Sequence, residues 1–193
     1  MDMTGEQLIP APRMKVWEAL NDPQQLKQAI PGCQTVDKTS DTEFTATVVA
    51  KVGPVSATFK GKVTLSNLRP GEGYSITGEG AGGAAGFGKG GAEVTLEDAP
   101  GGGTLLKYSA HASVGGKLAQ IGSRLIEGTV NQTAEQFFSR FGALVSAGSE
   151  SAAAPAEATP AQPAPAKASG SRTWIWIAAA VVVAAIVVIV LVT

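Results

Sequence analysis

The sequence predicts an α+β domain in which a seven-stranded antiparallel sheet wraps around a long C-terminal helix. A linker and a C-terminal transmembrane helix are predicted to follow it. Three observations support this organisation. Over residues 1–146 the apolar positions repeat with a helical period, then a period of two, then a helical period again. Residues 147–173 are mostly Ala, Pro, Ser and Gly, which favours a disordered linker. Residues 174–192 contain no charge, glycine or proline.

The N-terminal part predicts one strand followed by two short helices. Val16, Trp17 and Leu20 share one face at helical spacing, and Pro12 suits a first helical turn. The run Asn21-Asp22-Pro23 ends this helix and caps the next. The strands predicted along the whole chain are residues 3–10, 33–38, 43–52, 55–66, 73–80, 90–98 and 104–114.

The clearest alternation lies in the hairpin of residues 43–66, which has one apolar and one polar face. Many residues on the apolar face of the sheet are small. They are Ala46, Ala50, Ala57, Gly61, Gly78, Gly80, Ala92, Ala110 and Ala112. A curved sheet with small inner residues favours an apolar cavity that takes a lipophilic ligand. The alternative is a tight core, in which the small residues let the helix pack closely against the sheet.

Residues 117–146 carry an apolar stripe at spacings of three and four, which predicts one long helix. Gly122 and Gly128 weaken that helix by up to about 1 kcal/mol each, so they suit close packing or a hinge.

The glycine-rich stretch of residues 78–91 contains a GxGxxG pattern. A phosphate-binding loop of that type needs a helix after it, whereas strands are predicted on both sides here. A long, mobile strand-to-strand loop is the better interpretation. Phe87 is its one large apolar residue, and gating a cavity mouth, touching lipid and plugging the loop remain alternatives.

Composition excludes several classes of function. Residues 1–150 carry 13 Lys and Arg against 15 Asp and Glu, which argues against a nucleic-acid-binding protein. Cys33 is the only cysteine and His111 the only histidine, so a Cys/His zinc site within one chain is excluded. His111 falls on the polar face of its strand, and Cys33 is interpreted as a small buried residue. No catalytic or metal-ligating residue is predicted, and the protein is expected not to be an enzyme.

Trp174 to Val192 are predicted to cross a membrane. A helix of about 19 residues spans about 28 Å, close to the thickness of the hydrocarbon core. Trp174 and Trp176 suit the headgroup layer, and Lys167 and Arg172 precede the span while no charge follows it. We therefore expect a single-pass protein of the inner (cytoplasmic) membrane, with its N-terminal domain in the cytoplasm.

Several stretches resemble the CoxG family, the G-type component associated with carbon monoxide dehydrogenase. They are MDMTGEQLIPAPRMKVWEALNDPQQLKQAIPGCQ, VGPVSATFKGKVTLS, GEGAGGAAGFGKGGAEVTL and VGGKLAQIGSRLIEG. The predicted order of elements is similar to the helix-grip order of the START-like, or SRPBCC, superfamily. The resemblance implies a hydrophobic ligand pocket and a role in holding a molybdenum-containing CO dehydrogenase or a related hydroxylase at the membrane.

The resemblance leads us to expect a binding protein whose partners are the lipid bilayer, such a dehydrogenase and a lipophilic ligand. A respiratory quinone, menaquinone or ubiquinone, is the expected ligand, and no covalent cofactor is expected. The alternatives are a pure membrane scaffold without a transported ligand and a carrier of another lipid. The residues expected to line the pocket are Trp17, Leu20, Ile30, Phe44, Val48, Ala57, Phe59, Ile76, Phe87, Tyr108, Leu125 and Phe137. Each of them suits an ordinary core equally well.

Overall fold

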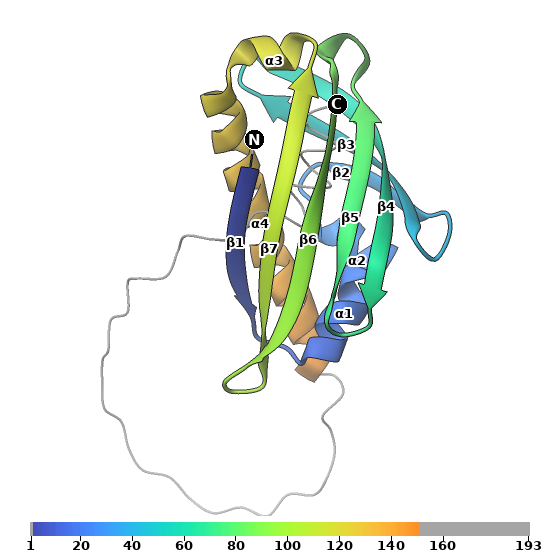
Figure 1. Cartoon of the computed structure of the whole chain (residues 1–193), viewed down its shortest axis with the longest axis vertical. Helices are drawn as coiled ribbons and strands as arrows, with labels where there is room; N and C mark the ends of the chain where they lie inside the picture. The colour runs from blue at the N-terminus through green and yellow to red at the C-terminus, as the bar shows by residue number, and fades with distance from the viewer. Residues whose placement is uncertain (1, 151–193) are drawn as a thin grey trace, which may run out of the picture.

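Seven antiparallel strands form one sheet in the computed structural model, which describes residues 2–150 (Figure 1). The strands are β1 (Asp2–Ile9), β2 (Cys33–Lys38), β3 (Glu43–Val52), β4 (Val55–Arg69), β5 (Gly73–Ala81), β6 (Phe87–Ala99) and β7 (Gly103–Gly115). They lie in the order β1-β7-β6-β5-β4-β3-β2, so only β1 leaves its sequential place to pair with β7. The predicted seven-stranded antiparallel sheet is confirmed.

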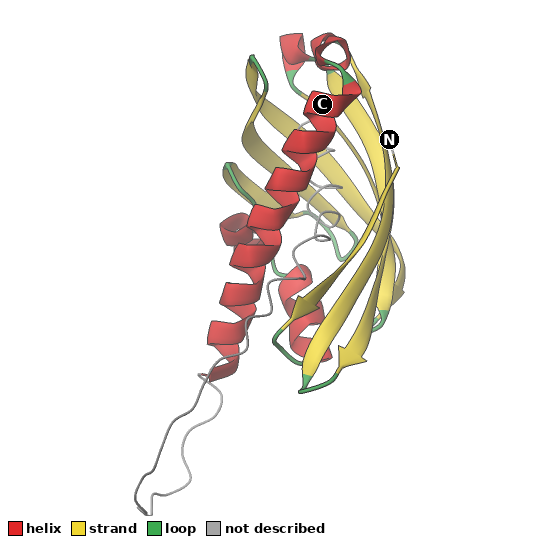
Figure 2. Ribbon diagram, turned by 90° about the vertical axis from the view of Figure 1, so that its left-hand side faces the viewer, coloured by secondary structure: helices red, strands yellow, loops and turns green. Residues whose placement is uncertain are grey.

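The helices pack against the inner face of this sheet. They are α1 (Arg13–Leu20), α2 (Pro23–Ala29), α3 (Lys117–Ile121) and α4 (Ser123–Glu150), with a short 3-10 helix η1 (Gly83–Ala85). The strands curve around α4, which runs along the length of the sheet (Figure 2). The N-terminus of α2 begins as predicted: the Asp22 carboxylate accepts a hydrogen bond from the Gln24 N–H at 2.8 Å, and Pro23 follows it.

The predicted single helix of residues 117–146 is wrong in one respect, because it is divided at Gly122. Gly122 has φ +94°, and no heavy atom lies within 4 Å of the position of a Cβ there. The glycine is therefore needed for its left-handed backbone and not for close packing. The helical backbone of α4 also continues to Glu150, past the predicted start of the linker at residue 147.

The prediction of a long loop at residues 78–91 is also wrong. Gly78 pairs with Gly90 and Ala81 with Phe87, so most of the stretch belongs to β5 and β6. Only residues 82–86 connect the two strands. The glycines continue the ladder because the pairing is made by backbone groups, which glycine supplies as well as any residue. Phe87 is consequently the first residue of β6 and not the tip of a loop.

The core lies between the inner face of the sheet and the helices α1, α2 and α4. The buried stripe of α4 consists of Ile126, Val130, Ala134, Phe137, Phe138, Phe141 and Val145. One buried polar side chain ties two chain segments together: the Thr104 hydroxyl donates to the Ala11 carbonyl at 2.7 Å. No helix among residues 2–150 is long and apolar enough to span a membrane, and the predicted span at residues 174–192 lies outside the described residues.

Candidate ligand-binding site

Ten of the twelve residues predicted to line a pocket lie in the interior. Eight are buried: Leu20, Ile30, Phe44, Val48, Phe59, Ile76, Tyr108 and Phe137. Trp17 and Ala57 are half-buried. Phe87 and Leu125 are exposed at 58% and 55%, so their predicted place inside a pocket is wrong. Leu125 is displaced because the break at Gly122 changes the phase of α4, whose buried stripe begins at Ile126 instead.

Aromatic side chains fill the interior around α1 and the middle of α4. The rings of Trp17 and Tyr74 meet edge to face at 5.4 Å, and burial raises the pKa of Tyr74 above its usual value. Tyr108 stacks on Phe138 at 6.3 Å, while its ring extends beneath Gly5 of the edge strand β1. This part of the interior is a well-packed core.

The opposite end of the interior is less completely covered. We define the hairpin end as the β3–β4 hairpin, η1, α3 and the first turns of α4, which lie at the top of Figure 1. Five inward-facing apolar residues here are only half-buried, namely Ala50, Val55, Ala57, Val114 and Ile121. A Cβ at Gly53 would lie 3.6 Å from Ile121 and 3.9 Å from Leu125, so the hairpin tip touches the α3–α4 junction. Apolar surface of the interior is therefore accessible to solvent beside this contact.

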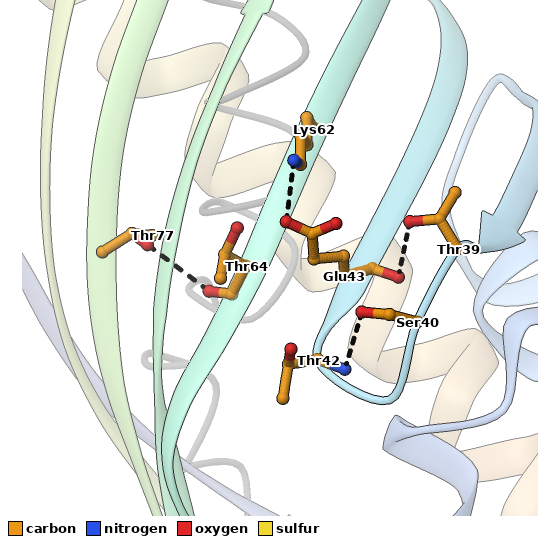
Figure 3. Close-up of polar contacts among 7 residues, drawn as sticks. All are labelled: Thr39, Ser40, Thr42, Glu43, Lys62, Thr64 and Thr77. Atoms are coloured by element: carbon orange, nitrogen blue, oxygen red, sulfur yellow. Dashed lines mark hydrogen bonds and ion pairs between the residues drawn. The ribbon is translucent and has the colours of Figure 1, made fainter.

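A separate groove of about 690 Å³ crosses the outer face of the sheet. Inward-facing Gly61, Gly80 and Gly88 border it together with the outward-facing residues on both sides of each, so their backbone forms its floor. Lys62, which lines the groove, pairs with Glu43 at 2.7 Å (Figure 3). No residue of α4 contributes to this groove, which distinguishes it from the predicted site between the sheet and the last helix.

Residues 5–146 match the CoxG family, described as the G-type component of carbon monoxide dehydrogenase. The chain belongs to the CoxG family. No curated protein matches it. CoxG membership and the fold point to a ligand-binding protein associated with carbon monoxide dehydrogenase.

Solved structures confirm the fold. A conserved protein from Geobacillus kaustophilus is 24% identical with a TM-score of 0.71, over 76% of this chain and 96% of that one. Ara h 8.0201 is 18% identical with a TM-score of 0.56, over 76% and 98% of the two chains. The Zhui aromatase/cyclase from Streptomyces sp. R1128 is 13% identical with a TM-score of 0.51, over 76% and 93%. These neighbours have SRPBCC, or polyketide cyclase-like, folds.

The residues that sequence reasoning missed are at the hairpin end. Val55, Val114 and Ile121 were not among the predicted pocket residues, although they face the accessible part of the interior. The available signal was Gly122: a glycine that interrupts an apolar helical stripe indicates a new element with its own phase. Treating residues 117–121 as a separate helix would have turned Ile121 inward.

The chemistry of the remaining candidate residues is limited. His111 is exposed on the outer face, with its ring beside Gly91 of the neighbouring strand, as its place in the alternation predicts. Within the described part of the chain, no three His, Cys, Asp or Glu side chains are grouped to hold a metal ion. Cys33 is half-buried, and its thiol donates to the Thr35 carbonyl at 3.4 Å.

Cys33 is expected to alkylate slowly at neutral pH. Burial raises the pKa of its thiol to about 11, while Lys27 lowers it and Asp37 raises it by smaller amounts. Because the ordinary value is 9.0, the thiolate should be about a hundredfold scarcer below pH 9 than in an unshifted cysteine. Iodoacetamide labelling of folded and urea-unfolded protein at several pH values measures this. Equal rates at pH 8 would contradict the expected shift.

The raised pKa of Cys33 also has a consequence for folding. The unfolded chain ionises first, so the contribution of this thiol to stability is complete below pH 9 and is lost between pH 9 and about 11.

Proposed function

We propose that this CoxG-family protein binds a respiratory quinone through the apolar interior at its hairpin end and brings a molybdenum-containing CO dehydrogenase to the membrane. The observation that carries the proposal is the half-buried apolar surface of Ala50, Val55, Ala57, Val114 and Ile121 beside an otherwise closed core. A partly covered apolar surface suits a ligand that is itself apolar over most of its length.

The proposed division of labour leaves the redox chemistry to the quinone. Oxidation of CO with water yields CO₂, two electrons and two protons, and reduction of a quinone to a quinol consumes two electrons and two protons. The protein need only hold the quinone where the dehydrogenase can reduce it. Within residues 2–147, the lone histidine lies on the outer face and the lone cysteine is only weakly acidic, which suits a binding role.

The predicted anchor and linker give this proposal its cellular setting. They occupy residues 174–192 and 147–173, most of which lie outside the described residues. A domain held near the bilayer meets quinone where quinone partitions. We propose accordingly that the domain works on the cytoplasmic side of the inner membrane.

Reconstitution tests the proposal. Full-length protein in quinone-containing vesicles receives a purified molybdenum CO dehydrogenase and CO, and quinol formation is followed by absorbance together with sedimentation of the enzyme. We expect both quinol formation and enzyme recruitment to require the protein. Recruitment with quinol formation independent of the protein would favour the scaffold, and loss of both would exclude either role.

A further inference from the structure

The charges of the described residues are segregated along the sheet. The row of paired residues Thr45, Lys62, Glu79, Lys89 and Ser113 divides the hairpin end from the rest. Residues 45–62, 79–89 and 113–128, which begin at this row, contain six Lys and Arg against two Asp and Glu. The remaining residues of the range 2–150 contain seven against thirteen. The net charge is therefore +4 at the hairpin end and −6 elsewhere.

Most cations of the hairpin end have no carboxylate partner within the described residues. Lys62 pairs with Glu43, whereas Lys51, Lys60 and Lys89 make no ion pair there. Lys60 and Lys89 line the outer groove, and Lys51 is exposed on β3. Elsewhere on the domain, Arg13 and Lys107 are matched by Asp98 and Glu97. The positive field of the hairpin end is thus left for an external anion.

Large apolar side chains project from the same end. Leu125 is 55% exposed at the start of α4, where it adjoins the hairpin tip at Gly53. Phe87 is 58% exposed at the start of β6, and its ring lies over Gly115. Pro54 is exposed at the tip of the hairpin. These residues come from separate projecting elements, which suits shallow insertion into a fluid interface better than a contiguous protein-binding patch.

Exposed apolar residues at the far end do not share this electrostatic setting. Leu8, Met14 and Leu68 are also exposed, but they lie in the part of the domain that carries net negative charge. An anionic bilayer repels that part and attracts the hairpin end. The charge therefore distinguishes between the two ends where apolar exposure alone does not.

We propose that the hairpin end docks on the surface of an anionic bilayer, with its lysines against lipid headgroups and Phe87 and Leu125 in the interfacial layer. This inference rests on the proposed function and deepens it, because docking in this orientation turns the accessible interior toward the bilayer from which the quinone comes. The 28 residues of α4 span about 42 Å, and the 23 residues from 151 to 173 reach at most about 76–83 Å when fully extended. The predicted tether is therefore long enough for this orientation.

Depth-dependent fluorescence in the full-length protein tests the proposal. Single cysteines at Leu125→Cys and at Leu68→Cys, each in a Cys33→Ser background, carry an environment-sensitive fluorophore. The protein is reconstituted in vesicles of phosphatidylcholine with or without phosphatidylglycerol, each containing nitroxide-labelled lipid as quencher. We expect quenching at position 125, enhanced by phosphatidylglycerol and reduced by salt, and little quenching at position 68.

Charge reversal supplies the matched control. Lys51→Glu with Lys117→Glu should lower the ratio of docked to undocked protein at least about tenfold. Lys27→Glu with Arg140→Glu changes the net charge equally at exposed sites outside the hairpin end and should leave the ratio within about twofold. Equal effects of the two pairs, equal quenching at positions 125 and 68, or quenching indifferent to phosphatidylglycerol would overturn the proposal.

Two outcomes separate this inference from the proposed function. Absence of lipid quenching at position 125, with fluorescence responding only to added dehydrogenase, would assign the basic end to an acidic protein surface and overturn bilayer docking. Quinone retained in such a protein would leave the proposed function standing. Docking without any bound quinone would have the opposite meaning, because the domain would then be a membrane-bound scaffold.

Discussion

Replacing Phe137 by alanine is expected to lower the free energy of unfolding by about 3–5 kcal/mol. Phe137 is fully buried on α4, where it stacks on Phe141 at 5.3 Å and meets Phe138 edge to face at 5.1 Å. Removing the ring leaves a cavity that these neighbours can fill only in part. Urea denaturation of the full-length protein, followed by tryptophan fluorescence and circular dichroism, measures the change.

Two control variants give this prediction its meaning. Phe137→Leu keeps most of the volume and should cost clearly less than the alanine variant. Gln136→Ala changes an exposed neighbour on the same helix and should stay within about 0.5 kcal/mol of the parent. A loss below about 1 kcal/mol for Phe137→Ala would mean that this ring is not part of a tightly packed core. Its predicted role as a ligand contact would then be favoured.

Ala57→Phe is expected to weaken quinone binding by about 1–3 kcal/mol, or about 5- to 150-fold in affinity. Ala57 is half-buried on the inner face of β4 and pairs with Ala50 of β3 at the hairpin end. A phenyl ring there occupies space that the proposed ligand needs, whereas the side chain has solvent to relax into and the core stays intact. Titration of delipidated full-length protein with quinone in detergent measures the affinity.

Ala143→Phe is the matched control, because Ala143 is exposed on α4 and receives the same added volume. We expect its quinone affinity to equal that of the parent. Unfolding curves for both variants show whether any loss follows from instability. Unchanged affinity in a folded Ala57→Phe protein would place the ligand elsewhere or leave the protein without one.

The alternation of the sheet was the part of the fold most accessible from sequence. Phe44, Val48, Phe59 and Ile76 are all buried as predicted. The reason is geometric: in a strand with one wet face, a slip by one residue would turn every apolar side chain outward, so the pattern determines the face. The resemblance to the CoxG family was confirmed by the match over residues 5–146.

Glycine was the residue whose role the sequence left ambiguous. The same residue type breaks the helix at Gly122 and continues a ladder at Gly78 and Gly80. Backbone freedom permits both outcomes, and the choice depends on tertiary pairing that a local pattern does not contain. The displaced Leu125 and Phe87 follow directly from those two errors. Both residues now belong to the end of the domain that we propose to face the membrane.

Extraction of the purified full-length protein with organic solvent is the most direct test of the central claim that the domain carries a quinone. Mass spectrometry of the extract, compared with an extract of Ala57→Phe protein prepared in the same way, gives the amount of isoprenoid quinone per chain. The account predicts close to one quinone per parent chain and a small fraction of that in the variant. Equal amounts in the two proteins, or none in either after incubation with menaquinone and ubiquinone, would contradict it.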